Sequence, residues 1–321
     1  MPIPQLTVLP FLESICWQGQ RSSVEGLSEM EILQLYERNW HYRGAIADLS
    51  KTEETMLVQL AQKHHSWLAN EIEIRPMQFR RPIHNTILRI LNAINSDFFA
   101  DCSILFGGGT LLTLAYGEYR LSRDIDFLCP YGESFSRLRR SVFDNSYRAL
   151  FDLAKCDEIS FPTEIRAGRD GIRFAVQIED TVLKFEIVAE GRIPLDPPSY
   201  PTWSPVACLS MVDQIAEKLL ANGDRWPDRS VHSRDLIDLA ILRESMAFPD
   251  EAIAKAEAAY PTVEPLKRSL LSFQSKPQYR LQCYERLAIQ SPSVVIDGLD
   301  SLALQFDLPK FNRQHTEIAP T

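Results

Sequence analysis

The chain has 321 residues, of which 45% are hydrophobic and 24% charged, enough for a substantial core in about two or three domains. The net charge of −9 argues against a broadly basic nucleic-acid-binding surface, but it leaves room for a local basic patch. The six cysteines are scattered without a CxxC pair, which suits a reducing compartment and argues against structural zinc. No apolar run is long enough to span a membrane, and no basic region leads into a signal-peptide core. We therefore expect a cytoplasmic protein with no membrane contact.

The N-terminal region, residues 1–100, is predicted to be helical. Ser28 and Glu31 have the spacing of a capping box at the start of a helix. Two further helices are predicted, for residues 55–68 and 82–99. In the second, apolar residues recur at helical spacing at Ile83, Ile87, Ile90, Leu91 and Ile94. The simplest interpretation is that these helices pack against other elements.

A glycine-rich turn follows a predicted buried strand that ends at Phe106. Gly107, Gly108 and Gly109 allow positive φ and the close approach of a ligand to the backbone. The apolar residues after Thr110 predict a helix, whose unpaired N–H groups, with the Thr110 hydroxyl, favour binding of a polyphosphate. The alternative is a tight strand-to-helix turn without a ligand. The turn is not a Walker A loop, because no Lys-Ser or Lys-Thr follows the glycines at the required position.

Two aspartates stand on a predicted apolar strand soon after this turn. Successive side chains of a strand point to opposite faces, so Asp124 and Asp126 project together while Ile125 and Phe127 face a core. Two carboxylates side by side are suited to share a hard cation such as Mg²⁺ or Mn²⁺. The alternative is an ordinary solvated strand face. The order and spacing of the turn and the aspartates favour the metal site.

A central domain is predicted for residues 101–193, and it contains a β-hairpin formed by residues 171–178 and 181–188. On the second strand Lys184 and Glu186 share one face. This face is interpreted either as part of the site or as exposed surface. Arginines lie near the aspartates and the hairpin and are interpreted as a solvated face, although such patches are able to contact phosphates. They are Arg120, Arg123, Arg137, Arg139, Arg140, Arg166, Arg169 and Arg173.

A proline-rich connector, residues 194–206, precedes a predicted C-terminal helical domain, residues 207–321. The first helix is predicted for residues 207–222 and is expected to stop at Asn222-Gly223. Lys218 lies on this helix, where a lone lysine is ordinarily exposed to solvent.

A second C-terminal helix is predicted to have Ser233 as its N-cap. Asp235 then lies in the first turn, and Asp238 lies on the same face of the helix. Either aspartate is interpreted as structural, paired with Arg234, Arg225 or Lys218, or as part of a site.

The segment GGGTLLTLAYGEYRLSRDIDF resembles the AbiEii/AbiGii toxin family of the nucleotidyltransferase superfamily. The superfamily signature is a Gly-Gly or Gly-Ser turn, a helix, and then a strand carrying Asp-x-Asp. The family also has a downstream lysine on a helix, here Lys218 in EKLLA, and an Arg-Asp-x-x-Asp-Leu element, here RDLIDL beginning at Arg234. The resemblance covers residues 104–242, and these motifs assign no function to the flanks.

The resemblance implies an α+β fold, in which a nucleotidyltransferase core with a small mixed sheet is flanked by N-terminal helices and a C-terminal helical domain. It also implies a Mg²⁺ or Mn²⁺ ion held by Asp124, Asp126 and, as a third acid on a neighbouring strand, Glu186. The third acid of the superfamily is usually aspartate, so the glutamate is a departure.

For the substrate, the resemblance implies a nucleoside triphosphate whose phosphates contact Gly108, Gly109 and Thr110. Lys218 would offset charge on the leaving pyrophosphate, and Asp235 is favoured as a further site residue. Relatives of this kind modify the acceptor end of transfer RNA and act with an antitoxin, in toxin–antitoxin or abortive-infection systems. Two alternatives stay open: a nucleotide-binding regulatory module without turnover, and nucleotidylation of a protein or a small-molecule antibiotic.

Overall fold

The computed structural model describes residues 9–18, 27–43, 47, 49–69 and 79–318. The chain divides into two compact units, Met1–Gln78 and Phe79–Thr321. The second unit combines a mixed sheet with helices, so the predicted α+β class is confirmed. Within the described ranges no helix has both the length and the apolar character needed to cross a bilayer. The domain bounds at residues 100, 193 and 206 remain predictions.

The described residues of the first unit include the helices α1 (Pro10–Gln18), α2 (Glu29–Asn39) and α3 (Lys51–Lys63) and the 3₁₀ helix η2 (Trp40–Tyr42). The capping box at the start of α2 is confirmed, because Ser28 Oγ accepts from the Glu31 amide while the Glu31 carboxylate accepts from the Ser28 amide. The helix predicted for 55–68 begins earlier and ends at Lys63. The fully buried Glu53 of α3 accepts hydrogen bonds from the Phe11 and Leu12 amides, so it satisfies the N-terminus of α1.

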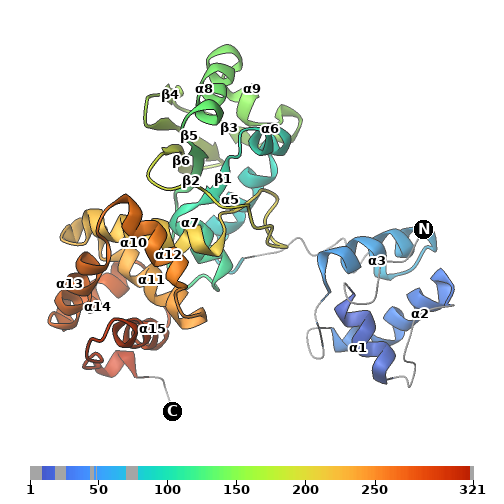
Figure 1. The fold of residues 1–321 in the computed structure, drawn as a ribbon. Helices are drawn as coiled ribbons and strands as arrows, with labels where there is room; N and C mark the ends of the chain where they lie inside the picture. Colours follow the sequence, from blue (N-terminus) through green and yellow to red (C-terminus); the bar gives the residue numbers. More distant parts are fainter. Residues whose placement is uncertain (1–8, 19–26, 44–46, 48, 70–78, 319–321) are drawn as a thin grey trace. The chain divides into compact units, whose positions relative to one another are not determined.

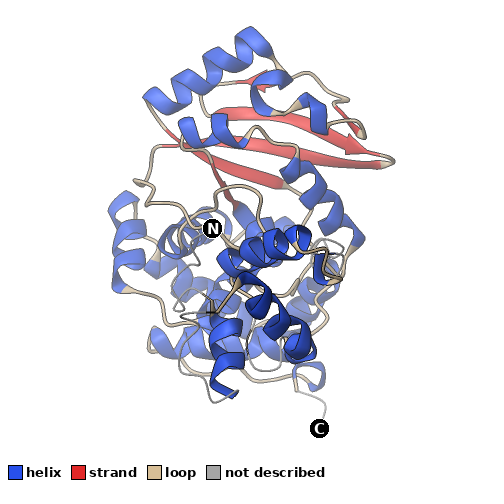
Figure 2. Cartoon of the chain, turned by 90° about the vertical axis from the view of Figure 1, so that its right-hand side faces the viewer, coloured by secondary structure: helices blue, strands red, loops and turns tan. Residues whose placement is uncertain are grey.

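The second unit is built on one mixed sheet, drawn in red in Figure 2. The sheet has six strands in the order β1-β2-β6-β5-β3, and β4 also pairs with β5. The strands are β1 (Leu105–Gly107), β2 (Ile125–Pro130), β3 (Ile159–Ser160), β4 (Arg166–Ala167), β5 (Gly171–Ile178) and β6 (Thr181–Glu190). The predicted hairpin is confirmed as the antiparallel pair β5–β6. β2 runs parallel to β6, in a register that pairs Asp126 with Glu186. The register therefore brings the two acidic positions of distant segments next to each other.

Five helices accompany the sheet: α5 (Pro82–Asn92), α6 (Ser96–Asp101), α7 (Gly108–Ala115), α8 (Glu133–Asn145) and α9 (Tyr147–Leu150), with η3 (Leu153–Lys155) after them. The single helix predicted for 82–99 is wrong, because the chain breaks between α5 and α6. Asn95 accepts a hydrogen bond from the Phe98 amide and so caps a new helix, while Ile94 pairs with Phe151. The apolar stripe of α5 nevertheless packs in the core of the sheet, as its period indicates.

The C-terminal part consists of α10 (Met211–Arg225), η4 (Arg229–Val231), α11 (Arg234–Ser245), α12 (Asp250–Ala259), α13 (Val263–Gln274), α14 (Pro277–Arg286), α15 (Pro292–Gln305) and η5 (His315–Glu317) (Figure 1). The first helix differs from its prediction at both ends. The Ser210 side chain accepts from the Asp213 amide and so caps the start of α10. The helix then continues through Gly223 to Arg225. Trp226 keeps helical backbone and still donates to the Asn222 carbonyl, but Pro227 has no N–H to continue the hydrogen bonds, so α10 ends at Arg225 and not at the glycine.

Helix α7 lies between the two hydrophobic cores of the second unit. Its Leu111 and Leu114 belong to the core around the sheet, whereas Leu112 belongs to the core of the C-terminal helices. The helix contacts α10 and α11 as well as β1 and β2. The glycine turn at its start is therefore fixed where the sheet meets the C-terminal helices.

Candidate active site

The glycine turn places its backbone against an aspartate. Strand β1 ends at Gly107 and α7 begins at Gly108, whose φ is +69°, so the predicted positive φ is confirmed. A Cβ at Gly108 would lie 2.5 Å from Oδ2 and 2.8 Å from Cβ of Asp126. Glycine is thus required both by the backbone conformation and by the approach of the Asp126 side chain.

We expect the variant Gly108→Ala to lower the free energy of unfolding by roughly 2–5 kcal/mol, because it adds a left-handed alanine and displaces Asp126. Gly117 is the matched control, since its φ is +74° but a Cβ there meets no atom within 4 Å. Gly117→Ala should cost only the backbone term of roughly 1–2 kcal/mol. Urea denaturation measures both values. Equal losses in the two variants would show that the close approach to Asp126 is not constraining.

The two aspartates line one cleft of about 320 Å³ with Gly108 and Gly109. Asp124 immediately precedes β2, and Asp126 is its second residue. Burial and the neighbouring Asp124 carboxylate raise the pKa of Asp126 to about 6. Two close carboxylates in a partly desolvated position repel each other, and a bound cation would relieve this repulsion. The two carboxylates therefore fit a divalent metal ion, which prefers oxygen ligands.

Glu186 lines the same cleft but is held by cations. Arg173 and Lys184 both form ion pairs with its carboxylate. Burial disfavours the charged form, but these partners outweigh it and lower the pKa of Glu186. Among the described residues no group of three His, Cys, Asp or Glu side chains is arranged to hold a metal. The aspartate pair therefore fits an ion as it stands, whereas Glu186 would have to leave an ion pair to join it.

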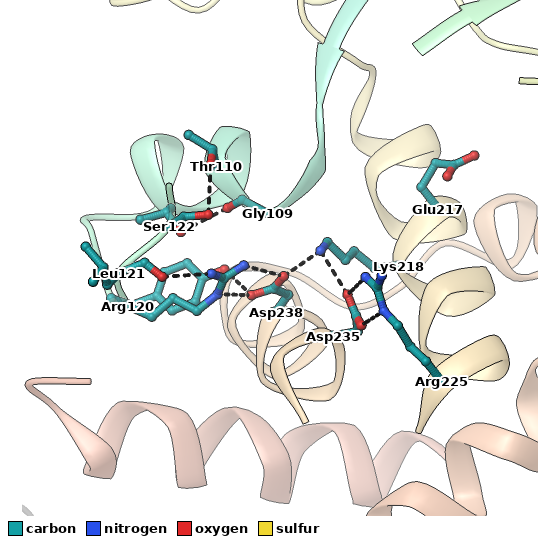
Figure 3. A network of polar contacts seen from close by, with 12 residues as sticks. Gly109, Thr110, Arg120, Leu121, Ser122, Glu217, Lys218, Arg225, Asp235 and Asp238 are labelled. Atoms are coloured by element: carbon teal, nitrogen blue, oxygen red, sulfur yellow. Dashed lines mark hydrogen bonds and ion pairs between the residues drawn. The ribbon is translucent and has the colours of Figure 1, made fainter. Parts of the chain in front are cut away.

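Lys218 is buried, contrary to the ordinary expectation for a lone lysine on a helix, and it lines the cleft. Its ammonium lies 3.1 Å from Asp235 Oδ1 and 2.6 Å from Asp238 Oδ2, both on α11 (Figure 3). The predicted same-face spacing of these aspartates is what lets both reach one ammonium. They fix the position of Lys218 at the wall of the cleft.

Asp235 lies behind Lys218 and does not line the cleft itself. Its carboxylate accepts from Arg225 Nε and Nη2 at 2.6 and 2.8 Å. Burial alone would raise its pKa, but Lys218 and Arg225 hold it well below the usual range. Ser233 precedes α11 as predicted, but its side chain makes no capping hydrogen bond. Its backbone is left-handed, and its hydroxyl donates to the Tyr279 hydroxyl instead.

Thr110 is not brought into the cleft. Its side chain is fully buried, and Oγ1 hydrogen-bonds to the Asp124 carbonyl at 2.5 Å and to Ser122 Oγ at 2.8 Å. The Thr110 hydroxyl therefore fixes the backbone of Asp124. A phosphate contact from Thr110 remains a prediction.

Arg120 was expected on a solvated face, yet it is buried. Its Nε and Nη2 donate to the two oxygens of Asp238 at 2.6 and 2.9 Å, as Figure 3 shows. The guanidinium passes so close to the turn that a Cβ on Gly109 would collide with Nη2. Net charge and local spacing could not predict the Arg120–Asp238 contact, because the two residues lie 118 positions apart in the sequence.

Sequence reasoning also missed Arg192 and Glu217, which line the cleft. Arg192 donates to Glu190 and Glu217 at 2.6 and 2.7 Å. Burial and the Glu190 carboxylate raise the pKa of Glu217 to about 8. Glu217 directly precedes Lys218, and this adjacency in the sequence was the available signal. The cleft thus combines carboxylates with cations, and the cations that line it are Arg120, Lys184, Arg192, Lys218, Arg225 and Arg234.

Known proteins match the part of the chain that forms the cleft. The family model described as nucleotidyl transferase AbiEii toxin, type IV toxin–antitoxin system, matches residues 89–286. A solved H. pylori protein described as a nucleotidyltransferase aligns at 19% identity over 70% of this chain and 92% of its own, with a TM-score of 0.41. JHP933 from Helicobacter pylori aligns at 19% identity over 72% and 92%, with a TM-score of 0.40. A nucleotidyltransferase-like antigenic protein from Paracoccidioides brasiliensis aligns at 10% identity over 64% and 94%, with a TM-score of 0.32. No curated protein matches the chain significantly.

Proposed function

The chain belongs to the AbiEii family of nucleotidyltransferase toxins of type IV toxin–antitoxin systems, and from this premise we propose that its cleft uses Mg²⁺ or Mn²⁺ to transfer a nucleoside monophosphate from a triphosphate to a hydroxyl of transfer RNA. One observation carries the proposal. Asp124 and Asp126 face the same cleft as Lys218, with the Gly108 turn between the sheet and the C-terminal helices. A carboxylate pair and a fixed cation in one cleft are the parts that phosphoryl-group transfer needs.

In this proposal the chain's own residues bind and orient the triphosphate. The backbone N–H groups of Gly108 and Gly109 lie at the start of α7, where they are suited to contact phosphate oxygens. Lys218, held by two aspartates, offsets negative charge on the leaving pyrophosphate. Asp124 and Asp126 would hold the divalent cation, which when bound supplies charge neutralisation and lowers the pKa of the attacking hydroxyl.

Asp235 is proposed as a positioning residue, because it contacts Lys218 and not the cleft. The family also supports an antitoxin partner, which we propose for this chain. Transfer RNA remains the proposed acceptor on the strength of the family resemblance.

The proposal is tested by incubating the protein with each α-labelled nucleoside triphosphate, Mg²⁺ and total transfer RNA. We expect label on RNA with at least one nucleotide, its loss with a chelator, and its return when Mg²⁺ or Mn²⁺ is added in excess. Label on a protein or a small-molecule antibiotic with RNA unlabelled would contradict the acceptor. Labelling that persists in the chelator would contradict the cation requirement.

A second candidate, a nucleotide-binding module without turnover, draws support from the ion pairs that Arg173 and Lys184 form with the Glu186 carboxylate, the expected third acid. The same incubation separates it from the first. Cation-dependent binding of the triphosphate, measured by equilibrium dialysis, with no labelled product on any acceptor, would favour the second candidate.

A further inference from the structure

A second cavity of about 230 Å³ lies in the C-terminal helices, apart from the glycine turn and the aspartate pair. It is formed by the end of α10, the 3₁₀ helix η4, the start of α11, α13 and the start of α14. Arg225 lines both this cavity and the cleft. The two sites therefore share one guanidinium, which also binds Asp235.

The cavity is electropositive. Arg229 and Lys276 line it, and neither forms an ion pair with a carboxylate among the residues that the structure describes; Lys276 donates to Ser272 Oγ at 2.7 Å. The acidic residue of the lining, Asp235, is already neutralised by Lys218 and Arg225. Two cations without carboxylate partners beside a neutralised acid favour an anionic ligand.

The cavity also has aromatic walls and an unsatisfied donor. Trp226, Phe273 and Tyr279 line it, and the Arg229 guanidinium lies 5.6 Å from the centre of the Tyr279 ring. Asn222 is 2% exposed, and its Nδ2 has no hydrogen-bond partner among the described residues. A buried amide donor costs free energy unless a ligand or solvent satisfies it. Aromatic faces, cations and an amide together are the groups that recognise a base and its phosphate.

We propose that this cavity binds one nucleotide unit of the acceptor RNA, with the phosphate near Arg229 and Lys276 and the base against Trp226 and Tyr279. Its volume is below the roughly 300–1,000 Å³ of sites that enclose a whole small ligand, so it suits one unit of a longer chain. The shared Arg225 places that unit beside the transfer cleft. The inference rests on the proposed function, because it specifies where the acceptor is held.

The test measures binding and not transfer, in the full-length protein carrying Asp124→Ala/Asp126→Ala and with a chelator present. The probes are a fluorescein-labelled single-stranded RNA, followed by anisotropy, and the four free nucleoside monophosphates, followed by calorimetry. The test variants are Arg229→Ala/Lys276→Ala and, separately, Trp226→Ala. The matched control is Arg286→Ala/Lys310→Ala, two exposed cations of the same region that do not line the cavity. Thermal melting verifies that each variant is folded.

We expect each test variant to weaken RNA binding by roughly tenfold, and the control to leave it unchanged. The Arg229→Ala/Lys276→Ala variant should also reduce the salt dependence of binding by about 0.7 in log–log slope for each phosphate that the variant no longer neutralises. Monophosphate binding with this same variant dependence, and RNA binding without it, would overturn RNA as the source and leave a free nucleotide as the ligand.

Equal affinities of the test and control variants for both probes would overturn the cavity as a nucleotide site. That result would leave the proposed transfer reaction standing, since the aspartates play no part in the measurement. Conversely, an absence of transfer in the labelling experiment would overturn the proposed function without altering RNA binding by this cavity.

Discussion

Asp126→Asn should lower nucleotidyl transfer by roughly a thousandfold, since a hard divalent cation prefers a charged carboxylate and supplies several kcal/mol of charge stabilisation. The same change should leave the free energy of unfolding unchanged or raise it. Burial and the Asp124 carboxylate raise the pKa of Asp126 to about 6, so its negative charge is itself unfavourable in the folded protein. Activity and stability are therefore expected to move independently.

The measurements are the initial rate of label transfer and a urea denaturation curve on the same preparation. Asp144→Asn is the control, because Asp144 is an exposed aspartate of α8 that does not line the cleft. It should change neither quantity. Full activity of Asp126→Asn would remove the residue from the site, whereas a large loss of stability would mean that its charge has a structural partner.

Asp238→Ala should lower the free energy of unfolding by about 3–5 kcal/mol, the cost of leaving buried charges without their partner. Asp238 is fully buried and accepts two hydrogen bonds from Arg120 and one from Tyr119. It also forms an ion pair with Lys218. Burial disfavours its charge, but Arg120 and Lys218 outweigh this and lower the pKa of Asp238. Its removal leaves the Arg120 guanidinium buried without its carboxylate partner.

Asp297→Ala is the control for this loss. Asp297 also pairs with an arginine, Arg313 at 2.6 Å, but its side chain is 48% exposed. A surface pair contributes less than about 1 kcal/mol, so the control should be nearly neutral. Chemical denaturation of both variants gives the comparison. A cost for Asp238→Ala as small as that of Asp297→Ala would mean that water reaches the network and compensates the charges.

The glycine turn, the aspartate pair and the hairpin were predictable because each depends on local rules. The alternation of a strand placed Ile125 and Phe127 in the core, and both are fully buried. Positive φ at Gly108 followed from the freedom of glycine. The ends of helices were less predictable. The Asn95 side chain caps a new helix and Pro227 lacks the N–H that would prolong α10, and both effects compete with periodicity.

The partners of the charged residues were decided only by the tertiary structure. Local spacing indicated that Asp235 and Asp238 share a face, but it did not predict that Lys218 would be buried against both. Arg120 and Asp238 are separated by 118 positions, and Thr110 is turned toward the Asp124 carbonyl and away from the cleft.

The sequence by itself thus determined the residue types of the site and the short elements that carry them, since φ preference, alternation and capping act over a few residues. The tertiary structure alone decided which charges neutralise one another, which cations line the cleft, and that a second electropositive cavity forms beside Arg225. The physical reason is that burial and ion pairing depend on which distant segments the core brings together. No local pattern contains that information.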